Sequence, residues 1–213
     1  MHALGLNRFQ RVLCLGAHAD DIEIGCGGAL LRLIAENPEV SVHWAVFSAT
    51  DARAAEARAS YERFLGNAAR RQLELFEFND RYFPTSWAEI KGVFDGLARE
   101  LRPDLIFTHR RDDAHQDHRV LAELTWNAFR DHTILEYEIP KYEGDLGQPN
   151  VFVPLTADVA QRKAELIVES FATQRDKRWF AADTFLALAR LRGVECAAPE
   201  GYAEGFYARK LTF

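Results

Sequence analysis

The residue types most capable of chemistry gather near the start of the chain. His18, Asp20 and Asp21 follow an apolar stretch over 12–15 that predicts a buried strand, and a glycine-containing stretch leads from them into a predicted helix over 29–36. In an α/β fold, ligands bind at the carboxyl ends of parallel strands, where such a unit would place an imidazole and two carboxylates. A capped helix start would show the same aspartates, so this stretch alone decides nothing.

A second polar cluster occupies 109–118, directly after another apolar stretch over 105–107. It contains His115, Asp117 and His118, and a helix beginning near Asp117 would bring the two histidines onto one face. The two clusters together offer nitrogen and oxygen donors but no sulfur donor, a set that suits zinc. A catalytic zinc takes three protein ligands and leaves one position for water. The surplus carboxylates and imidazole could act as base, hydrogen-bond donor and orienting group, so the residues predict metal-assisted hydrolysis.

The stretches around these clusters alternate between strand and helix patterns. The expected strands are 12–15, 40–48, 73–78, 105–107, 134–139 and 151–153, with a strand-like pattern in 201–213. The expected helices are 29–36, 53–65, 86–101, 119–130, 160–171 and 183–191. This alternation predicts an α/β fold, a Rossmann-like three-layer sandwich with a mainly parallel sheet, formed by residues 1–213 as a single domain.

Composition excludes several kinds of partner. A net charge of −6 gives no basic surface that would hold nucleic acid or an anionic membrane, and no run of about 18 apolar residues occurs. Cys14, Cys26 and Cys196 lack metal-type spacing, and we expect all three to be packing residues. The chain is therefore expected to be cytoplasmic and soluble, with a small molecule as its partner; a homo-oligomer is compatible with the sequence.

Two motifs of the chain resemble those of the LmbE/PIG-L family of zinc-dependent N-deacetylases, which act mostly on N-acetylglucosaminyl compounds. The motifs are His18-Ala19-Asp20-Asp21 with Gly25-x-Gly27-Gly28, and Asp113-x-His115-x-Asp117-His118. Further similarity lies in Arg53-x-x-Glu56, Arg192-Gly193 and Tyr202-Ala203-Glu204. The family usually has proline at the positions of Ala19 and Gln116, a departure that removes backbone stiffness but no functional group.

The resemblance implies that one Zn²⁺ ion is bound per chain. Its ligands would be His18, Asp21 and His118. The adjacent side chains of Asp20 and Asp21 diverge, so only one of the two is expected to face the metal.

The same resemblance implies roles for the remaining polar residues. Asp20 would be the general base, His115 the polarising imidazole, and Asp117 would orient a neighbouring histidine. Four protein ligands would leave no position for water, so we expect His115 to act as an imidazolium held by Asp117 or Asp113. Arg53 is expected to hold the substrate, although a solvated arginine at a helix start would look the same.

The implied reaction is removal of an N-acetyl group from an amino-sugar-containing small molecule, such as an N-acetylglucosamine derivative or glycoconjugate, with release of acetate. The same chemistry on another amide, such as a thiol-conjugate or antibiotic intermediate, is an alternative, because the motifs do not define the substrate. A catalytically silent sugar-binding relative is disfavoured, since no ligand or base position is missing. A dinucleotide-binding module is also disfavoured, because Gly25-x-Gly27-Gly28 does not follow the first strand directly.

Overall fold

The computed structural model describes residues 5–211, and its strands form one sheet. The strand order is β3-β2-β1-β4-β5-β7-β6; β1 to β5 run parallel, and β7 is antiparallel to both β5 and β6. The strands are β1 (Arg11–His18), β2 (Ser41–Ser48), β3 (Arg70–Leu75), β4 (Leu105–His109), β5 (Ile134–Tyr137), β6 (Val151–Leu155) and β7 (Tyr202–Tyr207).

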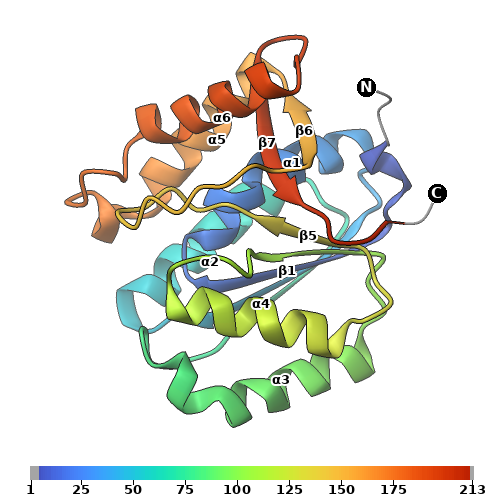
Figure 1. Ribbon diagram of the computed structural model, residues 1–213, viewed down its shortest axis with the longest axis vertical. Coiled ribbons are helices and arrows are strands. Elements are labelled where there is room, and N and C mark those ends of the chain that lie inside the picture. Colours follow the sequence, from blue (N-terminus) through green and yellow to red (C-terminus); the bar gives the residue numbers. More distant parts are fainter. Residues whose placement is uncertain (1–4, 212–213) are drawn as a thin grey trace.

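Helices cover both faces of this sheet (Figure 1). They are α1 (Asp21–Glu36), α2 (Asp51–Leu65), α3 (Trp87–Glu100), α4 (Gln116–Ala128), α5 (Ala157–Ser170) and α6 (Ala182–Glu195), with short 3₁₀ helices η1 (Leu6–Arg8), η2 (Phe83–Ser86) and η3 (Ala172–Gln174). Helices α3 and α4 lie below the sheet in Figure 1, and α1, α5 and α6 lie above it. Within residues 5–211, none of the helices is long and apolar enough to cross a membrane. The predicted α/β three-layer architecture is confirmed.

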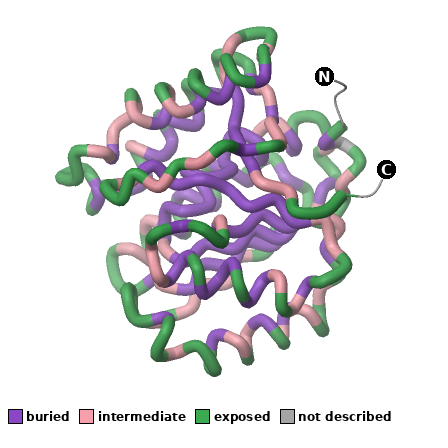
Figure 2. Tube along the Cα trace, in the orientation of Figure 1, coloured by how far each residue is buried: buried purple, intermediate pink, exposed green. Residues whose placement is uncertain are grey.

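Alternation along β1 explains how one strand supports both layers. Val12 and Cys14 pack in the core under α1, α2 and α5, whereas Leu13, Leu15 and Ala17 pack in the core under α3 and α4. Because both faces of the strand are covered, its sequence is an almost unbroken apolar stretch. Figure 2 shows the resulting buried centre between helices whose outer faces are exposed.

The first helix begins earlier than the sequence predicts. Helix α1 starts at Asp21, whereas the glycines of Gly25-x-Gly27-Gly28 had placed its start at 29 because glycine has low helix propensity. These glycines are needed for close packing: a Cβ atom on Gly25 would lie 2.2 Å from the Tyr137 ring of β5. The other predicted elements agree in type and shift by a few residues at their ends; residues 212 and 213 lie outside the described range.

Side chains from two other elements bond the backbone of α1 at this glycine-rich turn. The buried Glu204 carboxylate accepts hydrogen bonds from the N–H groups of Gly28 (2.8 Å) and Ala29 (2.7 Å). Lys163 donates to Glu204 (2.6 Å) and to the carbonyl of Ile24 (2.7 Å). These hydrogen bonds connect α1 to α5 and β7. Glu204, which belongs to the family-like stretch Tyr202-Ala203-Glu204, therefore has a structural role.

Pairing of β1 with β4 positions the two polar clusters. The strands are adjacent and parallel, so their carboxyl ends lie at the same edge of the sheet. His18 is the last residue of β1, and His109 is the last residue of β4. The expectation that two motifs about a hundred residues apart would converge is therefore met by the topology.

Because α1 lies so close to β5, we expect a substitution at Gly25 to lower the free energy of unfolding. Gly25→Ala should destabilise the fold by on the order of 1–3 kcal/mol, because the added methyl group would overlap the buried Tyr137 ring. The control is Gly92→Ala in α3, where a Cβ atom meets nothing within 4 Å. It should be neutral or stabilising by about 0.5–1 kcal/mol, as expected for alanine in a helix. Urea unfolding measures both, and equal effects would contradict this description of α1.

Candidate active site

Two imidazole nitrogens and one carboxylate oxygen lie close together at the carboxyl ends of the parallel strands. Nδ1 of His18 lies 3.3 Å from Oδ2 of Asp21 and 3.2 Å from Nε2 of His118. The distance between Oδ2 of Asp21 and Nε2 of His118 is 3.5 Å. Ligand atoms bound at about 2.0–2.2 Å to a tetrahedral metal ion lie roughly 3.3–3.6 Å from one another. The spacing of these three atoms thus fits one shared metal ion without rearrangement.

Local structure brings each of these side chains to the shared point. His18 ends β1, and its backbone N–H donates a 2.7 Å hydrogen bond to Oδ2 of Asp21, the first residue of α1. His118 lies in the first turns of α4 and is buried, as is Asp21. The side chain of His18 remains 16% exposed, so solvent reaches the cluster from its side.

The second nitrogen of each ligand-type histidine meets a carboxylate. Nε2 of His18 lies 3.2 Å from Oδ2 of Asp117 and 3.0 Å from Oδ1 of Asp80. Nδ1 of His118 lies 3.0 Å from Oδ2 of Asp113. Metal-binding histidines usually donate their other ring N–H to a carboxylate in this way, which leaves the nitrogen at the metal unprotonated. The arrangement supports His18 and His118 as a ligand pair.

Charge around His18 favours a cation. Burial lowers the pKa of His18, but the carboxylates of Asp21, Asp117 and Asp80 outweigh it and hold that pKa well above its ordinary value. Burial likewise raises the pKa of Asp21, but the neighbouring His118, His109 and His18 hold it well below its ordinary value. A pocket that stabilises positive charge on an imidazole is suited to bind a divalent cation at the same point.

Asp117 connects the cluster to a loop that the sequence did not single out. Its fully buried carboxylate accepts hydrogen bonds from the backbone N–H groups of Arg81 (2.6 Å) and Phe83 (3.2 Å), besides contacting His18. The expectation that Asp117 orients a histidine is therefore matched by a contact with His18. The loop held by Asp117 also carries Asp80, which sequence reasoning missed because nothing in its local pattern marks it.

His109 packs against the cluster from the core. It is fully buried, its ring stacks on that of His118 at 3.9 Å, and its Nε2 lies 3.2 Å from Oδ2 of Asp21. Asp21, His109 and His118 are close enough to share a metal ion. However, Nε2 of His109 accepts a 2.9 Å hydrogen bond from the backbone N–H of Ala17, which occupies the lone pair a metal would need. His109 is a core histidine that contacts two candidate ligands, His118 and Asp21.

His115 borders the cluster, and its ring is close enough to those of His18 and His118 for the three to share a metal ion. His115 is the N-cap of α4, and its Nδ1 accepts a 3.3 Å hydrogen bond from the backbone N–H of Asp117, which leaves the ring proton on Nε2. Burial and the charge of His18 lower the pKa of His115. The carboxylates of Asp113 and Asp117 bond His118 and His18 rather than the His115 ring. The structure thus favours a neutral imidazole over the imidazolium expected from the sequence.

Asp20 and Arg53 form an ion pair at the edge of the cluster. Asp20 precedes α1, and its buried Oδ1 lies 2.9 Å from Nη2 of Arg53. Arg53 is also bonded to Glu56 (3.1 Å), and its guanidinium lies over the Phe171 ring at 5.3 Å. Burial raises the pKa of Asp20, and Arg53 opposes that rise. Asp20 and Asp21 therefore diverge as expected, and Arg53, expected to hold substrate, contacts Asp20.

Comparisons with known proteins agree with this geometry. A family model described as PIG-L, GlcNAc-PI de-N-acetylase, matches residues 13–129, more than half of the chain. The N,N'-diacetylchitobiose deacetylase from Pyrococcus horikoshii is 18% identical, with 94% of this chain and 84% of that chain covered and a TM-score of 0.69. The A40926 pseudoaglycone deacetylase Dbv21 is 16% identical, with 93% and 96% covered and a TM-score of 0.70.

A further solved structure with this fold carries a different activity in its name. GalB, the 4-carboxy-2-hydroxymuconate hydratase from Pseudomonas putida KT2440, is 18% identical, with 96% of this chain and 98% of that chain covered and a TM-score of 0.70. At such identities a structural likeness shows a shared fold alone. The reaction therefore has to be argued from the family and from the site.

A Rossmann-like sheet with a cluster of histidines and aspartates at the carboxyl ends of its parallel strands defines an α/β enzyme with a candidate metal site. The family match makes the assignment more specific. The chain belongs to the PIG-L family, and it is a hydrolase of the deacetylase class.

The ion pair between Asp20 and Arg53 predicts the direction of a pKa change. Because the guanidinium lowers the pKa of Asp20, Arg53→Ala should raise that pKa further. Carbon-13 NMR titration of the aspartate carboxyl groups in the metal-free protein measures it without any assumption about substrate. Arg63→Ala, which removes an exposed arginine of the same helix, is the control and should leave Asp20 unchanged. If the pKa of Asp20 is unchanged in Arg53→Ala, Arg53 does not control the charge of Asp20, and only its expected role in substrate binding remains.

Proposed function

We propose that this protein is a zinc-dependent N-deacetylase that removes an acetyl group from an amino-sugar-containing small molecule, and that residues 1–213 form a single domain. The zinc ligands in this proposal are His18, Asp21 and His118. The observation that carries it is the mutual spacing of their three ligand atoms, 3.2–3.5 Å, within a PIG-L family site. Nitrogen and oxygen donors without sulfur support zinc as the metal.

Asp20 is the proposed base. When bound, zinc would lower the pKa of a water molecule and polarise the acyl carbonyl. Asp20 takes a proton from the attacking water and can return it to the amine nitrogen as the carbon–nitrogen bond breaks, so that acetate and a free amine leave. Its ion pair with Arg53 keeps the carboxylate available for this step, because the guanidinium counters the effect of burial on its pKa.

His115 is the proposed hydrogen-bond donor to the oxyanion. Its ring centroid lies 4.9 Å from that of His18 and 4.6 Å from that of His118, so it borders the metal site. With Nδ1 occupied by the N–H of Asp117, the proton on Nε2 is free to point at the reacting carbonyl. A neutral donor of this kind stabilises the negative charge that develops in the transition state.

The proposal also concerns which amide is the substrate. The names of relatives refer to deacetylation of a chitobiose derivative and of an antibiotic pseudoaglycone, so an N-acetyl sugar and an antibiotic intermediate are both supported as substrate classes. We favour an N-acetylglucosamine derivative, because the family description names that group. The three cysteines are buried and free, which supports the proposed cytoplasmic location.

The direct test combines metal analysis with an activity assay. Protein purified without chelators should contain one zinc ion per chain and release acetate from members of a panel of N-acetylglucosamine derivatives. Asp20→Asn should keep its zinc and lose turnover, because it removes the base with little change in shape. A fully active Asp20→Asn variant would eliminate the proposed base. Hydration of an unsaturated acid with no acetate release from any amide would eliminate the deacetylase function.

Metal content tests the ligand assignment separately from turnover. Replacing His18, Asp21 or His118 by alanine should sharply lower zinc content, because each supplies one of three protein bonds. His115→Ala should retain zinc and lose on the order of 10²- to 10⁴-fold in kcat/KM. The assignment is wrong if His115→Ala is purified without zinc while one of the other three variants keeps full occupancy.

A further inference from the structure

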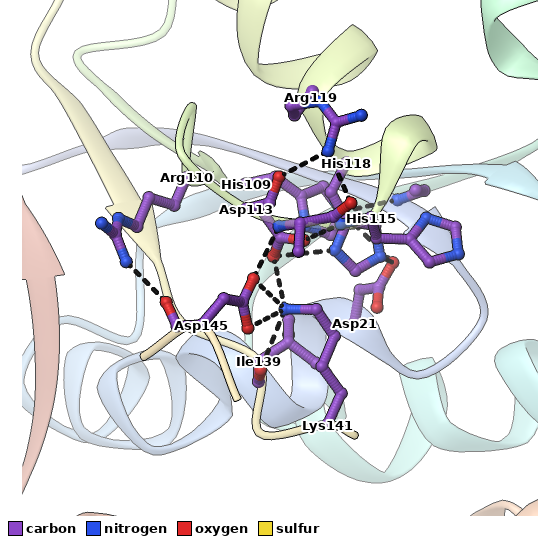
Figure 3. Close-up of polar contacts among 12 residues, drawn as sticks. Asp21, His109, Arg110, Asp113, His115, His118, Arg119, Ile139, Lys141 and Asp145 are labelled. Atoms are coloured by element: carbon purple, nitrogen blue, oxygen red, sulfur yellow. Dashed lines mark hydrogen bonds and ion pairs between the residues drawn. The ribbon is translucent and has the colours of Figure 1, made fainter. Parts of the chain in front are cut away.

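A buried lysine lies behind the candidate metal ligand His118. Lys141 follows β5, in the segment that leads to β6, and only 8% of its side chain is exposed. Its Nζ donates hydrogen bonds to Oδ2 of Asp113 (3.0 Å) and to both carboxylate oxygens of Asp145 (2.7 Å each). Figure 3 shows this ammonium between the two carboxylates. A lysine that is nine-tenths buried needs such partners, and here both face the second polar cluster.

The Asp113 carboxylate that meets Lys141 is also the partner of two site residues. Its Oδ2 lies 3.0 Å from Nδ1 of His118, and its Oδ1 accepts a 2.8 Å hydrogen bond from the backbone N–H of His115. Asp113 is therefore an acceptor shared by His118, His115 and Lys141.

Asp145 ties the same lysine to the loop that carries the second motif. Its Oδ2 accepts a 2.6 Å hydrogen bond from the backbone N–H of Ala114, and its backbone carbonyl accepts one of 2.9 Å from Arg110. Figure 3 shows Arg110 joined to Asp145, and Asp145 and Asp113 each joined to Lys141. The segment after β5 thus holds the 110–115 loop, a contact that no local sequence pattern predicts.

We infer that Lys141 is a positioning residue for the metal centre, acting through Asp113. Held by Asp145, its ammonium fixes the Asp113 carboxylate, which orients the imidazole of His118 and the backbone of His115. Without the ammonium, the Asp113 and Asp145 carboxylates would lose their shared partner and repel one another, and the Asp113 carboxylate would turn away from its present position. This change weakens the hydrogen bond to Nδ1 of His118 and with it the ligand. This inference rests on the proposed zinc site.

The test measures zinc affinity by competition with a chromophoric chelator, with no substrate present. Lys141→Met keeps an unbranched side chain of similar length but removes its charge. This variant should bind zinc about 10- to 100-fold more weakly than the parent, the range typical when a hydrogen-bond partner of a metal ligand is lost. Lys141→Arg should recover part of that loss. Lys91→Met in α3 is the matched control, because Lys91 pairs with Asp95 at the same four-residue spacing but on an exposed surface. It should bind zinc like the parent.

A double-mutant cycle separates positioning from a general loss of structure. If Lys141 acts through Asp113, Asp113→Asn should weaken zinc binding by a similar factor, and Lys141→Met should add little to it. Independent, additive losses would overturn the inference. The ring N–H proton of His118, observed by NMR in the zinc-loaded parent, should shift in Lys141→Met and remain unshifted in Lys91→Met. Thermal unfolding of the metal-free variants checks that each is folded.

The outcomes distinguish this inference from the proposed function. A parent protein that binds no zinc contradicts the proposed function itself. A parent that binds zinc and deacetylates, together with a folded Lys141→Met variant of unchanged zinc affinity, overturns only the role of Lys141.

Discussion

The parallel pairing of β1 with β4 is the constraint on which the site depends. Both strands are covered by helices on both faces, so their apolar residues fix them side by side in the middle of the sheet. Their carboxyl ends then deliver His18 and the 109–118 loop to the same edge. Neither motif contains a complete set of ligands, and the cluster exists only because the sheet joins them. The packing of Gly25 against Tyr137 also helps to position the cluster, because it places α1, which carries Asp21, close to β5.

Buried charge at this edge is stabilised in pairs. Asp20 pairs with Arg53, Asp113 with Lys141, and His18 with Asp117 and Asp80. A buried ion without a partner is strongly unfavourable, so each pair also restricts where its members can lie. This division leaves Asp21 and the facing nitrogens of two histidines as the atoms directed at one point. The pairing of buried charges therefore also separates the groups that remain free to bind a cation from those that are held by a partner.

The sequence predicted the features that rest on local patterns. Continuous apolar stretches marked β1 and β4, and the helical pattern of 119–130 marked α4, although the helix starts three residues earlier, at Gln116. The start of α1 was missed, because glycines that weaken an isolated helix are here required by a neighbouring ring and bonded by Glu204. Asp80, Lys141 and Asp145 were not predicted as site residues, since they lie in irregular segments and reach the site only through long-range contacts. Asp117 was expected to orient a neighbouring histidine, but spacing could not identify that histidine as His18, because the two residues are 99 positions apart in the sequence.

The proposed site holds one zinc ion with His18, Asp21 and His118 and leaves a position open. Zinc K-edge X-ray absorption of protein loaded with one equivalent of zinc tests this most directly. A zinc ion bound by these residues should have four nitrogen or oxygen neighbours at about 2.0–2.1 Å, with multiple scattering from two imidazole rings. Scattering from three or four imidazoles would mean that His115 or His109 is a ligand, and a sulfur neighbour at about 2.3 Å would place the metal elsewhere in the chain. Either result would show that the three ligands are wrongly assigned.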